Sequence, residues 1–413
     1  MWLRLRDSLL AVQPLLAAPI FFSVLLGVPP LWLSWLVAVT PLALRFWRDG
    51  RPFRGTPFDI PILLFSLGLL VGLLVSPNPG VSLGAFHTFL AGILIYYGIV
   101  SNSDNRNGYW LWVAGLVCLV VLGLSIWFFS EGEGRPLFFN EWVFSLAEPL
   151  PKITGPILNL HSLAAVLAVI VPVFLAMALF KNYRRLRLTA LALGLGFLLV
   201  LLLVASGSGW MAVALGLTLV LLCWRFWTAA IILPAAGIAT WLVAVYYDRA
   251  SWLAQVFSTD SLLGRMDYWG KTIDLLKDHP VTGLGLGAWP EVYSSHYGTS
   301  LVNVHNSYLQ LYCDTGFLGL VALIWAGVVF LRLSWPILSS SKQGVWYGVA
   351  VGIIGGIAAG AAQAIVEVTF SGTMVTATGY YYIGIPLLWI MAALFIVAYN
   401  RLSRGDINPE VEP

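Results

Sequence analysis

A cluster of polar side chains, which includes His305, Asn306 and Gln310, stands directly before a long apolar run. Asn306 or Ser307 can cap the N-terminus of the helix that this run predicts. His305 is then expected just outside the positive end of that helix, close to Asn303. A histidine at such a place can take a proton near neutral pH and act as a general base. The alternative is a structural role in which His305 only hydrogen-bonds the helix end.

Arg265 lies in a segment, 262–278, whose apolar residues recur at helical spacing, which predicts an amphipathic helix near the membrane surface. Arg265 borders the apolar stripe beside Tyr268, and no carboxylate lies three or four residues away. Lys271 and Lys277, by contrast, have acidic neighbours at these spacings and are expected to form solvated ion pairs. The planar guanidinium of an arginine without a local partner suits a phosphate ligand. The alternative is a side chain that extends to lipid headgroups.

The glycine run TGLGLGAWPE (282–291) resembles a dinucleotide-binding fingerprint only superficially. No strand is expected before it, and no acidic residue follows at the required distance. The run therefore predicts a tight turn after Pro280. A nest of backbone amides that binds phosphate is the alternative.

Metal binding is not indicated. The three cysteines, Cys118, Cys223 and Cys313, do not have the spacing of metal ligands and are interpreted as small buried side chains. The carboxylates in segments 130–155 and 248–314, which are predicted below to be outer loops, have the spacing of solvent-exposed residues rather than of metal ligands. No metal and no other cofactor is expected.

Lipid must surround most of this chain. Of its 413 residues, 59% are hydrophobic and 10% are charged, and the mean hydropathy is +0.86. A soluble domain of this length cannot bury so much apolar surface. Because about 20 apolar residues cross a bilayer, the chain is predicted to be an all-α integral membrane protein with about twelve transmembrane helices. They are expected at 8–27, 29–46, 57–76, 82–100, 109–129, 156–180, 188–205, 210–226, 228–247, 315–334, 344–366 and 379–399.

These helices divide the chain into four parts. Residues 1–247 hold helices one to nine and include an outer loop at 130–155. Residues 248–314 form a large outer loop before the tenth helix, and this loop carries the candidate active site. Residues 315–400 hold the last three helices, and 401–413 form a cytoplasmic tail. Long loops in compact folds are usually functional.

The orientation follows from the basic residues. With the N-terminus inside, 16 of the 22 lysine and arginine residues fall on the inner side and 6 on the outer side. Cytoplasmic loops carry an excess of lysine and arginine. Both termini are therefore predicted to be cytoplasmic, and the candidate site is predicted to lie on the outer face.

Three motifs in a fixed order resemble the signature of the O-antigen ligase and polymerase superfamily. They are GRMDYW (264–269), HPVTGLGLGAW (279–289) and HNSYLQLYCDTGFLGL (305–320). Members are multi-pass glycosyltransferases of the bacterial inner membrane that act on polyprenyl-diphosphate-linked glycans. The resemblance is strongest over 262–320, and the predicted helices and the large outer loop extend it loosely to the whole chain.

The resemblance implies two catalytic residues, because the family's loop arginine falls on Arg265 and its loop histidine on His305. TGPILNLHSLA (154–164) is similar to the family segment at the start of the sixth span. The residues expected to bind substrate are Asn159, His161, Arg249, Tyr268, Asn306, Tyr308 and Gln310.

The chain departs from the family pattern at one position. SGSGW (206–210) is similar to a Ser-Arg-x-x-Trp stretch, but Gly207 stands where an arginine is expected to help bind the donor diphosphate. Either Arg249, Arg135 or Lys152 supplies that charge, or the activity is altered or lost.

The activity implied by the resemblance is transfer of a glycan from a polyprenyl diphosphate to an acceptor hydroxyl. Positively charged donors can stabilise the leaving diphosphate without a metal, and a single displacement inverts the anomeric carbon. O-antigen ligase, glycan polymerase and protein O-glycosyltransferase activities all stay open. The expected partners are the glycan donor, a lipid or glycan acceptor and membrane lipids, but no nucleic acid.

Two alternatives come from other classes of protein. A small-anion transporter is expected to carry charged residues inside its spans and broken helices near the midplane. The predicted spans are almost free of charge, with His87 and Glu367 as the exceptions, and this favours the enzyme. A binding or scaffold protein derived from an enzyme stays open because of Gly207.

Overall fold

The structure, a computed structural model, describes residues 10, 12–26, 30–102, 160–180, 184–203, 206–226, 231, 259–299, 301, 303–340, 344–367, 373–376, 379–382 and 385–405. The helices predicted at 109–129 and 228–247 and the loop at 130–155 lie outside these residues, apart from Ile231. Asn159 and Arg249 lie outside them as well.

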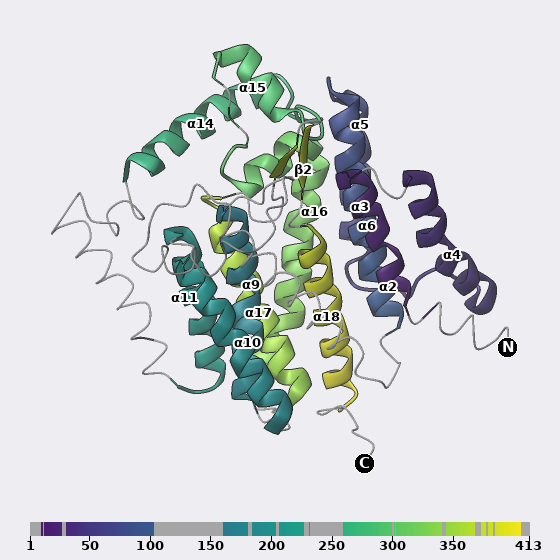
Figure 1. Cartoon of the computed structure of the whole chain (residues 1–413), viewed down its shortest axis with the longest axis vertical. Helices are drawn as coiled ribbons and strands as arrows, with labels where there is room; N and C mark the ends of the chain where they lie inside the picture. The colour runs from purple at the N-terminus through teal and green to yellow at the C-terminus, as the bar shows by residue number, and fades with distance from the viewer. Residues whose placement is uncertain are drawn as a thin grey trace, which may run out of the picture.

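Helices make up most of the described chain (Figure 1). In chain order they are α2 (Gln13–Leu16), α3 (Ala18–Leu26), α4 (Leu31–Asp49), α5 (Asp59–Val75), α6 (Pro79–Ser101), α9 (Leu160–Leu179), α10 (Arg184–Leu203), α11 (Gly207–Cys223), α14 (Thr259–Lys277), α15 (Trp289–Tyr297), α16 (Ser307–Leu338), α17 (Val345–Gln363) and α18 (Ile385–Ser403). Three of them, α6, α16 and α17, are long and apolar enough to cross a membrane. Shorter apolar stretches lie in α5, α9, α11 and α18. The fold therefore supports a multi-pass membrane protein, and the total of twelve spans stays a prediction.

A short hairpin, which the helical prediction does not include, lies between α17 and α18. Its strands β1 (Thr373–Thr376) and β2 (Gly379–Tyr382) pair antiparallel. The strands consist mainly of threonine, valine and tyrosine, which favour extended backbone. The last helix begins at Ile385 rather than at the predicted residue 379. Pro386 follows directly, and proline is well suited to the first turn of a helix.

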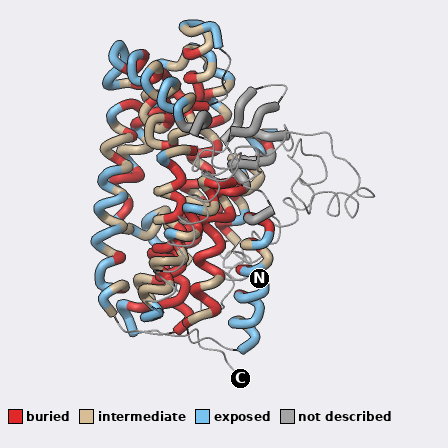
Figure 2. The backbone as a smooth tube through the Cα atoms, turned by 90° about the vertical axis from the view of Figure 1, so that its left-hand side faces the viewer, coloured by how far each residue is buried: buried red, intermediate tan, exposed pale blue. Residues whose placement is uncertain are grey.

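The core of the bundle forms where α17 packs along α9 and α11. Buried residues gather in the middle of the bundle (Figure 2). A Cβ atom at Gly352 would lie 2.6 Å from the Val173 Cα, and one at Gly356 would lie 2.3 Å from the Val169 carbonyl oxygen. Small residues of this kind allow helix backbones to approach closely in membrane proteins. The pairs step by four residues in opposite directions, so α9 and α17 run antiparallel.

Helix α16 is broken at Gly316, which has φ 62° and ψ −159°. The chain around Gly283 and Gly285 packs against this break, and the Phe317 N–H donates to the Val281 carbonyl oxygen at 2.9 Å. A Cβ atom at Gly316 would lie 2.1 Å from that carbonyl oxygen. The site therefore needs glycine for two reasons, a positive φ and a close backbone contact.

We expect Gly316→Ala to lower the free energy of unfolding by more than about 1 kcal/mol, because both the positive φ and the contact disfavour a side chain. Gly327→Ala is the matched control in the same helix, since a Cβ atom there meets nothing within 4 Å. It should leave stability unchanged or raise it by about 1 kcal/mol. Thermal unfolding of both purified variants in detergent measures the difference. Equal unfolding temperatures would contradict the assignment of the break.

Elements predicted on the outer face lie together at one end of the bundle, where α14 and α15 stand (Figure 1). The Leu286 N–H, in the loop before α15, donates to the Gly72 carbonyl oxygen of α5 at 2.9 Å. Ser82, near the start of α6, donates its hydroxyl to the Leu286 carbonyl oxygen at 2.6 Å. At the other end of α6, Arg45 of α4 donates to the Ser101 carbonyl oxygen at 3.0 Å. The two ends predicted from the basic residues are thus separate in space.

The side of the membrane on which each end lies can be tested by labelling. Ser295 of α15 and Ser403 of α18 are exposed serines, and each hydroxyl bonds to a carbonyl oxygen of its own helix. We expect Ser295→Cys to react with a membrane-impermeant thiol reagent in intact cells and Ser403→Cys to react only after permeabilisation. The wild-type chain, labelled in parallel, accounts for the native cysteines. The reverse pattern would overturn the predicted orientation.

Candidate active site

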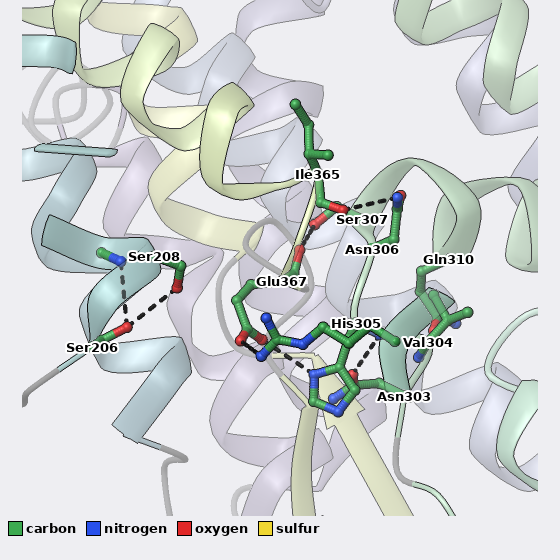
Figure 3. Close-up of polar contacts among 12 residues, drawn as sticks. Ser206, Ser208, Asn303, Val304, His305, Asn306, Ser307, Gln310, Ile365 and Glu367 are labelled. Atoms are coloured by element: carbon green, nitrogen blue, oxygen red, sulfur yellow. Dashed lines mark hydrogen bonds and ion pairs between the residues drawn. The ribbon is translucent and has the colours of Figure 1, made fainter. Parts of the chain in front are cut away.

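Arg265, His305 and Glu367 form a connected cluster of side chains. The Arg265 Nη2 atom lies 2.5 Å from Glu367 Oε1, and the His305 Nδ1 atom lies 3.2 Å from Glu367 Oε2. The three residues come from α14, from the loop before α16 and from the segment that follows α17. Figure 3 shows the Glu367 carboxylate next to the His305 ring. Glu367 therefore bridges the two residues that the sequence predicts to be catalytic.

Burial explains why this cluster holds together. The Glu367 side chain is 5% exposed and the Arg265 side chain 16%, whereas the His305 side chain is 27% exposed. A buried carboxylate needs a positive partner and hydrogen bonds, and Arg265 supplies both. As the sequence predicts, no carboxylate of α14 pairs with Arg265, and its partner is instead a residue 102 positions downstream.

The backbone of His305 is held in an uncommon conformation. Its φ is 51°, in the left-handed region, and its N–H donates to the Asn303 side-chain oxygen at 2.9 Å. Such conformations persist where the surroundings hold them, and they often occur at functional sites. The next residue, Asn306, caps α16 because its side-chain oxygen accepts the Leu309 N–H at 2.9 Å. The predicted cap before the tenth span is confirmed.

The start of α16 is tied to the end of α17. The Ser307 N–H donates to the Ala364 carbonyl oxygen at 2.8 Å, and the Ser307 hydroxyl donates to the Glu367 carbonyl oxygen at 3.0 Å. The Tyr308 hydroxyl donates to the Ala361 carbonyl oxygen at 2.7 Å. These bonds fix the backbone of Glu367 relative to His305.

Three predicted substrate-binding residues make hydrogen bonds within the protein. Asn306 donates to the Ile365 carbonyl oxygen at 2.9 Å (Figure 3). Tyr308 bonds α17 as described above, and the Gln310 amide donates to Asp314 at 3.1 Å. All three hold the site together, and their contact with substrate stays a prediction.

The glycine run is a structural loop. Gly283, Gly285 and Gly287 have φ values of 71°, 107° and 70°. The N–H groups from Gly283 to Ala288 all donate to protein oxygens, including the Cys313 carbonyl oxygen and the Asp314 side chain. The amides of these six residues are all occupied, so the turn is confirmed and a phosphate nest built from them is excluded.

Helix α14 positions Arg265 through its buried side. The Trp269 indole N–H donates to the Val304 carbonyl oxygen at 3.0 Å, directly before His305. Leu276 is buried and Tyr268 packs partly against the same apolar cluster, but Met266 and Ile273 of the predicted stripe are exposed. The amphipathic helix is confirmed, with a buried face narrower than the predicted stripe.

The other basic residues of α14 are paired as the sequence predicts. Lys271 lies 2.6 Å from Asp267, and Lys277 lies 2.7 Å from Asp274. The hydrogen bond that Lys271 donates to Asp267 raises the pKa of Lys271 above its usual range. On α15 nearby, burial raises the pKa of Tyr293. These lysines are solvated and lie apart from the cluster.

The starts of α9 and α11 lie at the same end of the bundle as Glu367. Ser206 caps α11 by accepting the Gly209 N–H at 3.3 Å, and its hydroxyl is 3.3 Å from that of Ser208. In the view of Figure 3 both serines lie to the left of Glu367, and His305 lies to its right. Gly207 is buried in the first turn of α11. His161 lies in the first turn of α9, and only its backbone is described.

Glu367 is a member of the candidate site to which the sequence assigns no role. In the sequence, the signal for this residue is a carboxylate at the end of an apolar span, where charged residues are rare and usually functional.

Among the described residues, no group of three or more histidine, cysteine, aspartate or glutamate side chains can hold a metal ion.

Apolar helices and a charged cluster at one end of the bundle define a multi-pass membrane protein with a polar site at the boundary of its spans. Residues 192–324 match the family described as O-antigen ligase, and this match supports the superfamily that the motifs predict. The matched segment covers roughly a third of the chain and includes both Arg265 and His305. No curated protein matches the chain closely enough to count as a relative.

Proposed function

We propose that this protein transfers a glycan from a polyprenyl-diphosphate carrier to an acceptor hydroxyl, at a site on the outer face of the bacterial inner membrane. The observation that carries the proposal is the Glu367 carboxylate, which bridges Arg265 and His305. A base, an orienting carboxylate and a cation are the groups that such a transfer requires.

His305 acts as the general base. Its Nδ1–H donates to Glu367 Oε2, which leaves Nε2 unprotonated and able to accept the proton of the acceptor hydroxyl. The acceptor oxygen forms a bond to the sugar C1 as the bond from C1 to the diphosphate oxygen breaks. Glu367 then stabilises the imidazolium ion. A single displacement of this kind inverts the anomeric carbon.

Arg265 stabilises the leaving diphosphate. A guanidinium has five N–H donors, and Glu367 engages Arg265 through Nη2. The remaining donors can reach an oxyanion while the ion pair holds the side chain in place. The positive N-terminus of α11 also favours a negatively charged ligand. Gly207 lies in its first turn, where the resemblance predicts an arginine. Arg249, Arg135 and Lys152 lie outside the described residues.

We expect Arg265→Lys to reduce transfer by at least about tenfold, because an ammonium ion cannot bond Glu367 and present a planar fork to phosphate at once. Lys277→Arg is the matched control on the same helix, where the side chain is exposed and pairs only with Asp274. Initial rates at saturating acceptor measure both. Activity of the Arg265→Lys variant within about twofold of wild type would mean that Arg265 serves only as the ion-pair partner of Glu367.

The function is tested with purified protein and a defined polyprenyl-diphosphate oligosaccharide. Lipid, glycan and protein acceptors are offered separately, and the product identifies a ligase, a polymerase or a protein O-glycosyltransferase. Transfer that needs His305 supports the proposal. Absence of transfer to every acceptor, together with anion flux in proteoliposomes, would favour the transporter instead.

A further inference from the structure

Gln363, the last residue of α17, is a buried polar residue without a hydrogen-bond partner. It is 1% exposed, and neither its Nε2 nor its Oε1 atom has a partner in the part of the chain that the structure describes. Buried amides are almost always hydrogen-bonded, and leaving one unpaired is costly. Gln310, by contrast, is equally buried and pairs with both Val304 and Asp314. The unpaired amide of Gln363 therefore needs an explanation.

Gln363 lies one helical turn below the active cluster. The Glu367 N–H donates to the Gln363 carbonyl oxygen at 2.9 Å, so the helical path of the chain continues from one residue to the other. Residues four apart on a helix share a face. Seen from the outer end, Gln363 is thus deeper toward the membrane than Glu367.

The starts of two helices lie at the same depth. Gly348, Gly352 and Gly356 of α17 contact Met177, Val173 and Val169 of α9 in antiparallel register. Two further steps of four residues place the backbone of His161, in the first turn of α9, level with the end of α17.

The start of α11 lies beside the start of α9, because a Cβ atom at Gly209 would lie 3.1 Å from the Ala164 Cβ atom. Helix α11 also runs antiparallel to α17, with Gly216 against Gly355. In the first turn of α11, Ser206 caps Gly209, and the N–H groups of Gly207 and Ser208 donate to no described group. Two helix N-termini and an unpaired buried amide therefore lie at the same depth, on three helices that pack together.

We propose that the Gln363 carboxamide and the N-termini of α9 and α11 bind the lipid-side phosphate of the diphosphate donor. This inference rests on the proposed function and specifies how its donor is held. In such a donor the sugar C1 lies outward and the polyprenyl chain lies in the membrane, so the phosphate nearest the lipid belongs below Arg265 and His305. Neutral N–H donors at helix N-termini are a common solution for phosphate. These N–H groups can bind the phosphate in place of the arginine that is expected at position 207, where this chain has glycine.

The test compares two variants of Gln363 in purified full-length protein. Gln363→Leu removes the hydrogen bonds at similar volume, and Gln363→Glu keeps the shape but adds a negative charge. The probe is polyprenyl diphosphate without a glycan, and polyprenyl monophosphate and phosphatidylglycerol serve as comparison ligands. We expect Gln363→Glu to weaken diphosphate binding by at least about tenfold, because it places like charges together. Gln363→Leu should weaken diphosphate binding less than Gln363→Glu does, and it should raise the donor KM.

Thermal unfolding separates binding from structure. Gln363→Leu should leave Tm unchanged or raise it, since it removes an unpaired buried amide, whereas Gln310→Leu should lower Tm. Unchanged diphosphate affinity in both Gln363 variants would overturn the proposal. It would also be overturned if the variants weakened the binding of phosphatidylglycerol as much as that of polyprenyl diphosphate. Because the probe carries no glycan, diphosphate binding is measured whether or not wild type transfers a glycan. A wild-type protein that binds the diphosphate but transfers no glycan would refute the proposed function and leave the binding proposal intact.

Discussion

Replacement of His305 by glutamine is expected to reduce glycan transfer by about a hundred- to ten-thousand-fold. Glutamine can hydrogen-bond Glu367 but cannot take up a proton near neutral pH, so the acceptor hydroxyl loses its base. His305→Ala should be equally inactive. Both variants should still bind the donor, because Arg265 and its ion pair are retained. Initial rates at saturating donor and acceptor, together with donor affinity, provide the measurement.

A structural role for His305 predicts the opposite ranking. In that case glutamine would preserve the helix end and most of the activity, while alanine would fold poorly. His296→Gln is the matched control, because His296 is an exposed histidine on α15 outside the cluster. An active His305→Gln variant, with the control also active, would reject the general-base role.

Neutralising Glu367 is expected to reduce the rate of glycan transfer by a similar factor. Glu367→Gln keeps the volume of the side chain but no longer fixes the tautomer of His305 or stabilises the imidazolium ion. Loss of the equivalent support for a catalytic histidine costs about ten-thousand-fold in serine proteases, and we expect at least about a hundredfold here. Donor affinity should be maintained, because the glutamine side-chain oxygen can still accept a hydrogen bond from Arg265, which keeps its charge.

The separation of kcat from affinity tests this role of Glu367. Glu291→Gln is the control, because Glu291 is an exposed glutamate whose carboxylate accepts a hydrogen bond from Asn78 and lies outside the cluster. Donor affinity is followed with the same glycan-free polyprenyl diphosphate as for Gln363. A Glu367→Gln variant that loses donor affinity and keeps kcat would show that Glu367 only holds the fold around Arg265.

Several features of the protein can be predicted from local patterns of its sequence. Apolar runs predict membrane-spanning helices, because a bilayer requires a certain length and composition. The amphipathic pattern around Arg265 predicts α14, and the acidic neighbours of Lys271 and Lys277 predict their ion pairs, since both depend on residues one helical turn apart. The cap at Asn306 follows for the same reason. Motif order alone predicts the superfamily, which the family match supports, and the catalytic roles of Arg265 and His305 stay predictions.

Only the tertiary structure decided which groups meet. Glu367 reaches Arg265 from 102 residues away and His305 from 62. No periodicity records such a contact, because it arises from the packing of α16 against the end of α17. The glycine run is compatible in sequence with a turn or a phosphate nest, and the bonds that the Gly283 to Ala288 amides make in the folded protein distinguish the two. Gln363 is an ordinary polar residue in sequence, and its burial beside two helix N-termini exists only because α9, α11 and α17 pack together, with glycines at the closest contacts.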